Sequence, residues 1–194
     1  MTGVRDEGRV LVVAGAADST NGLAGALRER YAVRVAVDAT AIPAGVADTD
    51  VVLVQADALD ASLRDVLTVL EGIDRERPLQ VCVISGKDLA GVDTVQTTLE
   101  SPVATDLLFE TVERLLSRAD YDAQLRRYFA VAARVAVLET RSGDDTSDDY
   151  QQATTRAEQI RASLEAAQSD LSDDDLFTVA AQPTNGERSG EAVE

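Results

Sequence analysis

Residues 51–71 read VVLVQADALDASLRDVLTVLE, and this stretch decides the fold. It opens with the continuous apolar run 51–54, which is typical of a strand buried on both faces of a parallel sheet. A helix is predicted over 62–71, where the apolar residues follow the i, i+3, i+4, i+7 spacing of one helical face: Leu63, Val66, Leu67 and Leu70. Either Asp60 or Ser62 can cap its amino end. A buried strand followed by an amphipathic helix is one unit of an alternating β/α fold.

The same alternation extends over residues 9–118. Further strands are predicted at 10–13, at 33–37, at 81–84 and around Leu99. Further helices are predicted at 22–30 and at 105–118, the latter with an inward face made of Leu107, Leu108, Val112 and Leu115. The connections after the second and fourth strands give only weak helical signals. This order predicts an α/β fold with a doubly wound, five-stranded parallel sheet.

The pattern changes after residue 118. Asp120 is predicted to cap a new helix that reaches residue 141, with an apolar face made of Leu125, Phe129, Ala132 and Ala136. After a polar turn over 142–149, a second helix is predicted from about 150 to 169, with a heptad seam made of Ala153, Ala157, Ile160, Leu164, Ala167 and Leu171. The two helices predict a small antiparallel hairpin of the coiled-coil kind. Its alanine-rich seam is thin, so it needs the first domain, a second copy or another protein as a partner.

The charge of the chain is strongly one-sided, with 35 acids, 18 bases and a formal net charge of −17 over 194 residues. Lys87 is the only lysine, and 45% of the residues are apolar, which argues against a disordered acidic chain. An acidic surface with scarce lysine predicts a protein of a very salty cytoplasm, because salt screens the repulsion. An ordinary acidic protein is the alternative. Nucleic acid is not an expected partner, since phosphate binding depends on basic side chains.

Residue types exclude several chemistries. The sequence has no histidine, which removes the usual general base, and Cys82 is its only cysteine, so Cys/His zinc sites are excluded. Cys82 lies in the apolar run 81–84 and is predicted to be a small buried hydrophobe. Residues 1–8 lack the apolar core of a signal peptide, and no apolar run approaches the roughly 20 residues that span a bilayer. We therefore expect a cytoplasmic protein without a membrane partner.

The β/α order and several local strings over residues 9–118 resemble a response-regulator receiver domain. The resemblance implies an acid pair after the first strand, a phosphoacceptor Asp at the end of the third, a Ser or Thr after the fourth and a Lys-Pro after the fifth. In such domains the acids hold a Mg²⁺, and the acceptor Asp attacks the phosphorus atom. The hydroxyl and ammonium groups then take up the phosphoryl oxygens and transmit the switch.

Most of these groups are absent here. The acid pair falls on Ala14 and Gly15, and the phosphoacceptor position is Gln55, an amide that cannot be phosphorylated as an Asp is. The hydroxyl is kept as Ser85. The lysine position is Ser101, whereas the proline is kept as Pro102, for which the resemblance implies a cis peptide bond. The pattern indicates a pseudo-receiver with no catalytic residue, no metal site and no cofactor.

Three nearby acids, Asp18, Asp57 and Asp60, are candidates to replace the lost carboxylates. Asp57 lies two residues beyond the acceptor position, so the loop geometry would have to be rebuilt around it. Asp18 alone would be a poor Mg²⁺ site. Asp18 and Asp57 are more simply interpreted as solvated loop acids. Ser85 also has a plain interpretation as a strand-end residue bonded to the backbone.

The string from Asp120 to Glu139 is similar to the start of the HalX domain, a small helical module that follows receivers in halophilic archaea. The resemblance covers about residues 120–178. It implies a role in signalling without defining a biochemical activity. The expected organisation is an N-terminal extension over 1–8, a receiver-like domain over 9–118, a HalX-like domain over 119–178 and a disordered acidic tail over 179–194.

The expected function is signal transduction in a two-component, phosphorelay-type pathway. We expect a non-enzymatic protein that acts through protein–protein contacts of both domains, with sensor kinases or other regulators as partners and a homodimer as one arrangement. The alternative is a transcriptional regulator that binds DNA or the transcription machinery. Arg126, Arg127 and Arg134 would supply the positive charge for that role.

Overall fold

A computed structural model of the chain describes residues 8–15, 17–75, 79–86, 95–142 and 148–168. Contacts divide the chain into two compact units, residues 1–130 and residues 131–194. The predictions for the extension over 1–7, for the turn over 143–147, for Leu171 and for the tail over 179–194 lie outside the described residues.

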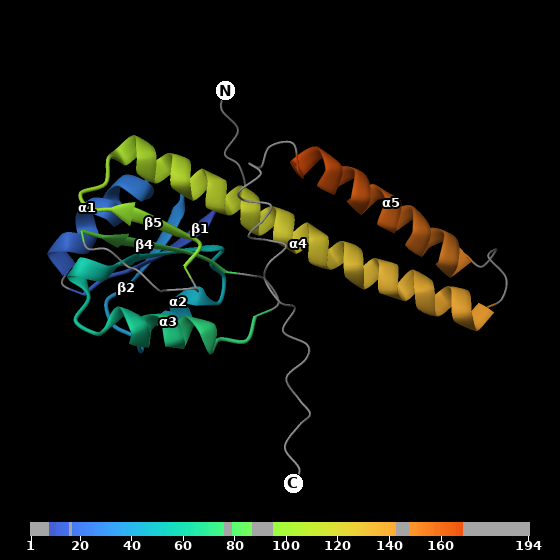
Figure 1. The fold of residues 1–194 in the computed structure, drawn as a ribbon, viewed down its shortest axis with the longest axis horizontal. Helices are drawn as coiled ribbons and strands as arrows, with labels where there is room; N and C mark the ends of the chain where they lie inside the picture. Colours follow the sequence, from blue (N-terminus) through green and yellow to red (C-terminus); the bar gives the residue numbers. More distant parts are fainter. Residues whose placement is uncertain (1–7, 16, 76–78, 87–94, 143–147, 169–194) are drawn as a thin grey trace, which may run out of the picture. The chain divides into compact units, whose positions relative to one another are not determined.

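The first unit contains a five-stranded parallel sheet in the order β2-β1-β3-β4-β5 (Figure 1). The strands are β1 (Arg9–Val13), β2 (Ala32–Ala36), β3 (Val51–Gln55), β4 (Gln80–Ser85) and β5 (Thr97–Glu100). This confirms the predicted doubly wound sheet. Four residues each of β1 and β3, and all six of β4, are buried, as the continuous apolar runs require. Cys82 is buried in β4, and its burial raises the pKa of the thiol to about 12.

Helices cover both faces of the sheet (Figure 1). One face packs against α1 (Ala17–Leu27) and the first turns of α4 (Thr105–Ser142). The core side chains are Ala24 and Leu27 from α1, and Leu108, Phe109, Val112 and Leu115 from α4. The other face packs against α2 (Ile42–Val46) and α3 (Leu63–Glu71) through Ile42, Val46, Val66, Leu67 and Leu70. Alternate residues of β1 enter opposite clusters, with Val12 in the first and Val13 in the second.

The start of α3 confirms one of the two predicted caps. The Ser62 hydroxyl accepts a hydrogen bond from the Asp65 backbone N–H at 3.2 Å. This contact satisfies one of the amide groups that a helix leaves unpaired at its amino end. Ser62 is therefore the cap, and Asp60 is left in the connection between β3 and α3.

Helix α4 differs from the prediction in two respects. It runs without interruption from Thr105 to Ser142, so the predicted new start at Asp120 is wrong. No glycine or proline lies between these ends, and Ala119 is buried within the helix. Leu107 is also wrongly predicted to face inward, because it is 47% exposed. Phe109 is buried in its place, with the Arg30 guanidinium 4.1 Å from its ring centroid.

The second unit contains the end of α4 and helix α5 (Asp148–Gln168). The Tyr150 hydroxyl donates a hydrogen bond to a Glu139 carboxylate oxygen at 3.0 Å, which joins the last turns of α4 to the start of α5. Every described residue of the predicted α5 seam is buried or half-buried: Ala153, Ala157, Ile160, Leu164 and Ala167. The period predicted for α5 is therefore confirmed.

The predicted face of α4 is rotated relative to the observed one. Phe129 is 61% exposed and Ala136 is exposed, so both were wrongly placed on the inward face. The half-buried positions in this part of α4 are Leu125, Tyr128, Val131, Ala132, Val135 and Leu138. The spacing allows two phases that differ by one residue, or about 100° around the helix. The prediction chose the phase that buries Phe129 because phenylalanine is the more apolar residue, whereas the structure buries part of the neighbouring Tyr128.

Candidate functional site

The residues at the predicted receiver positions gather at one edge of the sheet. Ala14 and Gly15 follow β1, Gln55 ends β3, Ser85 ends β4 and Ser101 follows β5. The strands are parallel, so their carboxyl ends meet at this edge, where ligands of doubly wound folds bind. The peptide bond between Ser101 and Pro102 is cis, as the resemblance implied.

The end of β1 is closed by the backbone of the connection between β3 and α3. The Gly15 N–H donates a hydrogen bond to the Ala58 carbonyl oxygen. A Cβ atom on Gly15 would lie 2.9 Å from the Asp60 carboxylate and closer still to the Ala58 carbonyl oxygen. Ala14 is fully buried. No side chain fits at Gly15 unless this backbone moves.

Gln55 lies at the predicted phosphoacceptor position, at the end of β3. Its side chain is half-buried, and its Oε1 atom is buried without a hydrogen-bond partner. The chain turns directly after it into η1 (Ala56–Ala58), a single 3₁₀ turn. This turn carries the next acid, Asp57, away from the line of the strand.

Asp57 is anchored to the end of β4. Its Oδ2 atom accepts a hydrogen bond from the Gly86 backbone N–H at 2.5 Å, and the Ser85 hydroxyl lies 3.5 Å from its Oδ1 atom. The Asp57 residue is exposed, whereas Ser85 is only 5% exposed. Asp57 is thus exposed, as predicted, but its carboxylate is also bonded to the end of β4. The Ser85 hydroxyl faces a carboxylate, while the Ser85 carbonyl oxygen accepts from the Ser101 N–H at 3.1 Å.

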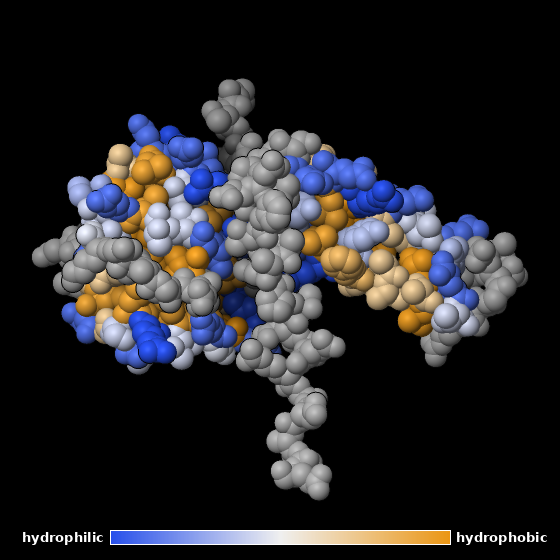
Figure 2. All heavy atoms as spheres, viewed as in Figure 1, coloured by the Kyte–Doolittle hydropathy of each residue, from blue (hydrophilic) through white to orange (hydrophobic). Residues whose placement is uncertain are grey.

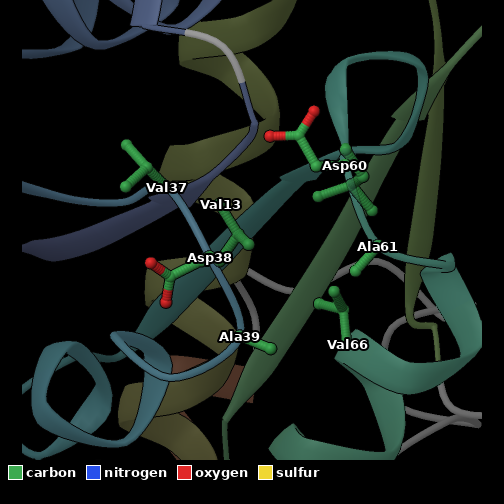
Figure 3. A pocket seen from close by; sticks show the side chains of 8 residues that line it. Val13, Val37, Asp38, Ala39, Asp60, Ala61 and Val66 are labelled. Atoms are coloured by element: carbon green, nitrogen blue, oxygen red, sulfur yellow. The ribbon is translucent and has the colours of Figure 1, made fainter.

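Asp60 lies near the end of β1, beside Gly15, whereas Asp57 is bonded to the end of β4. Asp60 lines a small pocket of about 190 Å³ (Figure 3). The lining is mostly apolar and consists of Val13, Val37, Asp38, Ala39, Leu59, Asp60, Ala61 and Val66. The Asp38 carboxylate is used within its own turn, where it accepts from the Thr40 hydroxyl and from the Thr40 and Ala41 N–H groups. The Thr40 hydroxyl, followed by these backbone donors, lowers the pKa of Asp38.

The Mg²⁺ of receiver domains does not fit these residues. Ala14 and Gly15 offer no side-chain oxygen, and the space above Gly15 is filled by backbone. Among the described residues, no three side chains of His, Cys, Asp or Glu are grouped so that they could hold a metal ion. The side chain of Asp18, the third candidate acid, lies outside the described part of the chain.

A buried polar contact that the sequence analysis missed lies at the other edge of the sheet. The Gln80 Nε2 atom at the start of β4 donates to the Asp122 Oδ2 atom in α4 at 2.9 Å, and both residues are buried. Arg118 is also buried, and its Nε and Nη2 atoms have no hydrogen-bond partner. Burial raises the pKa of Asp122, although Arg118 and then the Gln80 hydrogen bond oppose this. The sequence did carry one signal for this contact, because the polar Gln80 directly precedes the apolar run 81–84.

The comparisons with known proteins agree with this architecture. Residues 117–180 match the HalX domain family. The solved structure of a CheY-like receiver domain from Methylobacillus flagellatus has 14% identity and a TM-score of 0.51, and the match covers 57% of this chain and 99% of that one. A receiver domain protein from Clostridium thermocellum has 18% identity and a TM-score of 0.50, with 57% and 95% covered. None of the curated proteins matches this chain in sequence.

The fold of the first unit is therefore the receiver fold, and a HalX domain follows it. Within the described part of the chain, no helix is both long enough and apolar enough to cross a bilayer.

Proposed function

We propose that this protein is a pseudo-receiver with a HalX domain, which transmits signals through protein contacts and does not form an aspartyl phosphate. The observation that carries the proposal is the closure of the end of β1. The Ala58 carbonyl oxygen and Asp60 occupy the space that an acid at Gly15 would need. An acid could therefore return to this position only if the connection between β3 and α3 moved.

Exposed apolar side chains support a role in protein contacts. Phe129 and Val137 lie on α4, and they are 61% and 51% exposed. In Figure 2, apolar colours run along the later turns of this helix. Exposed apolar groups of this size gain free energy when a partner covers them. We infer that the partners are signalling proteins, with a second copy of the chain as one of them.

The decisive experiment is an attempt to phosphorylate the full chain. The protein is incubated with Mg²⁺ and a small phosphodonor in high salt, and its intact mass is measured. An active receiver domain serves as the positive control, and a Gln55→Asp variant tests whether the acceptor alone restores the reaction. We expect no added phosphoryl group on either form, because no acid pair is present to hold Mg²⁺. A stoichiometric gain on the wild-type chain would overturn the proposal.

A DNA-binding regulator is the second candidate, because the charge of α4 is locally reversed. Between Asp122 and Glu139 the chain has three arginines and no acid, although its net charge is −17. Arg126, Arg127 and Arg134 are all exposed. If this helix binds DNA, Arg126→Gln and Arg134→Gln should each weaken binding and flatten its salt dependence. Equal binding by these variants, or no binding at any salt concentration, would exclude this candidate.

A further inference from the structure

Two hydrogen-bond donors at the end of β4 converge on one carboxylate. The Gly86 N–H donates to the Asp57 Oδ2 atom at 2.5 Å, and the Ser85 hydroxyl lies 3.5 Å from the Oδ1 atom of the same group. We propose that Ser85 and Gly86 form an oxyanion-binding corner, and that the Asp57 carboxylate is its built-in ligand. This inference rests on the proposed function, because it assigns the corner an internal occupant in place of a phosphoryl group.

The chemistry of the corner suits an oxyanion. A hydroxyl and a backbone amide are both donors, and each can bond a separate oxygen of a planar or tetrahedral anion. The Ser85 side chain is buried, which fixes its position, whereas Gly86 and Asp57 are exposed to solvent. A small anion therefore has access to the corner once the Asp57 side chain is removed.

Of the described acids and amides near this edge, Asp57 is the one whose carboxylate reaches the corner. Gln55 ends β3, and its Oε1 atom has no hydrogen-bond donor. Asp60 lies against Gly15 and lines the pocket near β1. The 3₁₀ turn over Ala56–Ala58 is what carries Asp57 toward β4, where it bonds a residue 29 positions further along the chain.

The internal ligand makes the corner independent of external anions. The Asp57 carboxylate is tethered to the same chain and therefore acts at a high effective concentration. A free anion must compete with it for the two donors. The Asp57 contact also ties the connection between β3 and α3 to the end of β4. The corner therefore has a carboxylate ligand without any phosphodonor.

Inorganic phosphate is the probe for this inference. Thermal unfolding of the full chain is followed with increasing phosphate, while KCl keeps the ionic strength constant. The variants are Asp57→Ala and the matched control Asp60→Ala, which removes an equal charge from the same connection. We expect phosphate to raise the Tm of Asp57→Ala by about 3 °C at saturation, and to leave the wild type and the control unchanged relative to KCl. Adding Ser85→Ala to Asp57→Ala should abolish the increase.

Two results would overturn the inference. One is an Asp57→Ala variant whose Tm does not respond to phosphate, and the other is an equal response in all forms, which would indicate a general salt effect. If Asp57→Ala does not fold, Asp57→Ser provides the same test with a polar side chain too short to reach the Gly86 amide. These outcomes are separate from the phosphodonor experiment, because a covalent mass gain would refute the proposed function whatever phosphate does to the Tm.

Discussion

Gly15 stands at the end of β1 with the connection between β3 and α3 directly against it. The Gly15 N–H donates to the Ala58 carbonyl oxygen, and a Cβ atom here would meet that oxygen and the Asp60 N atom. A glycine at such a position serves the close approach of two backbones. The same feature that excludes an acid therefore also stabilises the connection.

We predict that Gly15→Ala lowers the free energy of unfolding by about 1–3 kcal/mol, since the added methyl group forces backbone to move. Gly22→Ala is the matched control, because a Cβ atom there would meet nothing within 4 Å. Gly22 lies within α1, so the control should gain about 0.5–1 kcal/mol from its better helix propensity. Denaturant unfolding measures both changes. A neutral Gly15→Ala would show that the connection is not packed as described.

The buried carboxyl of Asp122 predicts a pH dependence of stability. Burial raises its pKa in the folded state above the ordinary value. Between the unfolded and the folded pKa of Asp122, the folded protein binds more protons than the unfolded chain. The stability that protonated Asp122 contributes is therefore fully present below the unfolded pKa. It is lost as the pH rises through the folded pKa. Asp122→Asn should remove this dependence, because an amide does not titrate.

The measurement is thermal unfolding of the wild type and Asp122→Asn from about pH 4 to pH 7 at constant salt. The Tm of the wild type should fall relative to that of the variant as the pH rises. Asp106→Asn, which removes an exposed acid from the same helix, controls for the change in net charge. A constant difference between the wild type and Asp122→Asn would contradict the raised pKa.

At the scale of single residues, the sequence located the residues at the predicted receiver positions but not their contacts. Ala14, Gly15, Gln55 and Ser85 could be located because they follow apolar runs that define the strand ends. The Asp57 contact could not be foreseen, because it depends on a 3₁₀ turn that has no residue signature here. Asp122 was also missed, since an acid near the start of a predicted helix is ordinarily exposed.

Among the elements, α4 shows where local signals mislead. Asp120 has the residue type of an amino-terminal cap, yet the helix continues through it. A cap residue competes for backbone bonds only if the chain is free to turn there. The flanking Arg118 and Ala119 are buried in the same helix, and this packing outweighs the local preference. Propensity is a weak guide when tertiary contacts oppose it.

The continuity of α4 can be tested with proline. Asp120→Pro should lower the free energy of unfolding by about 3 kcal/mol or more, because proline in a helix interior removes a hydrogen bond and clashes with the preceding turn. Asp106→Pro lies in the first turn of the same helix, where proline is tolerated, and should cost much less. Equal, small losses in denaturant unfolding would mean that a new helix begins near residue 120.

The observed phase of α4 makes a separate prediction. Phe129 is 61% exposed, so Phe129→Ala should change the free energy of unfolding by about 0.5 kcal/mol or less. Leu164 in α5 is 8% exposed, and Leu164→Ala should cost about 2–5 kcal/mol. Thermal and denaturant unfolding distinguish the two. A large loss for Phe129→Ala would restore the predicted inward face. A small loss leaves Phe129 available for a partner.

For the whole molecule, the order of strands and helices was the most predictable property. Buried parallel strands carry continuous apolar runs, and the alternation with helices leaves few topologies. The apolar period of α5 was predictable for the same reason, whereas the phase of α4 was not. Period depends on spacing alone, but phase depends on which of two neighbouring apolar residues finds a partner.

The net charge of −17 predicts that stability rises with salt. Exposed ion pairs such as Arg30–Glu113 at 3.7 Å contribute little, so they leave most of the repulsion among the acids uncompensated. The Debye length falls from about 8 Å at 0.15 M to about 3 Å at 1 M salt, so most of the increase in Tm should occur below about 1 M KCl.

A variant with fewer charges separates this screening from other effects of salt. Four exposed acids are replaced by the corresponding amides: Glu29, Asp74, Glu110 and Glu158. The variant should have a higher Tm than the wild type at low KCl, and the two should converge as salt increases, because screening removes only the repulsion that the variant already lacks. Parallel curves would show that salt acts by strengthening apolar burial instead. A wild-type Tm that does not depend on KCl would contradict the sequence-based expectation that this acidic surface suits a salty environment.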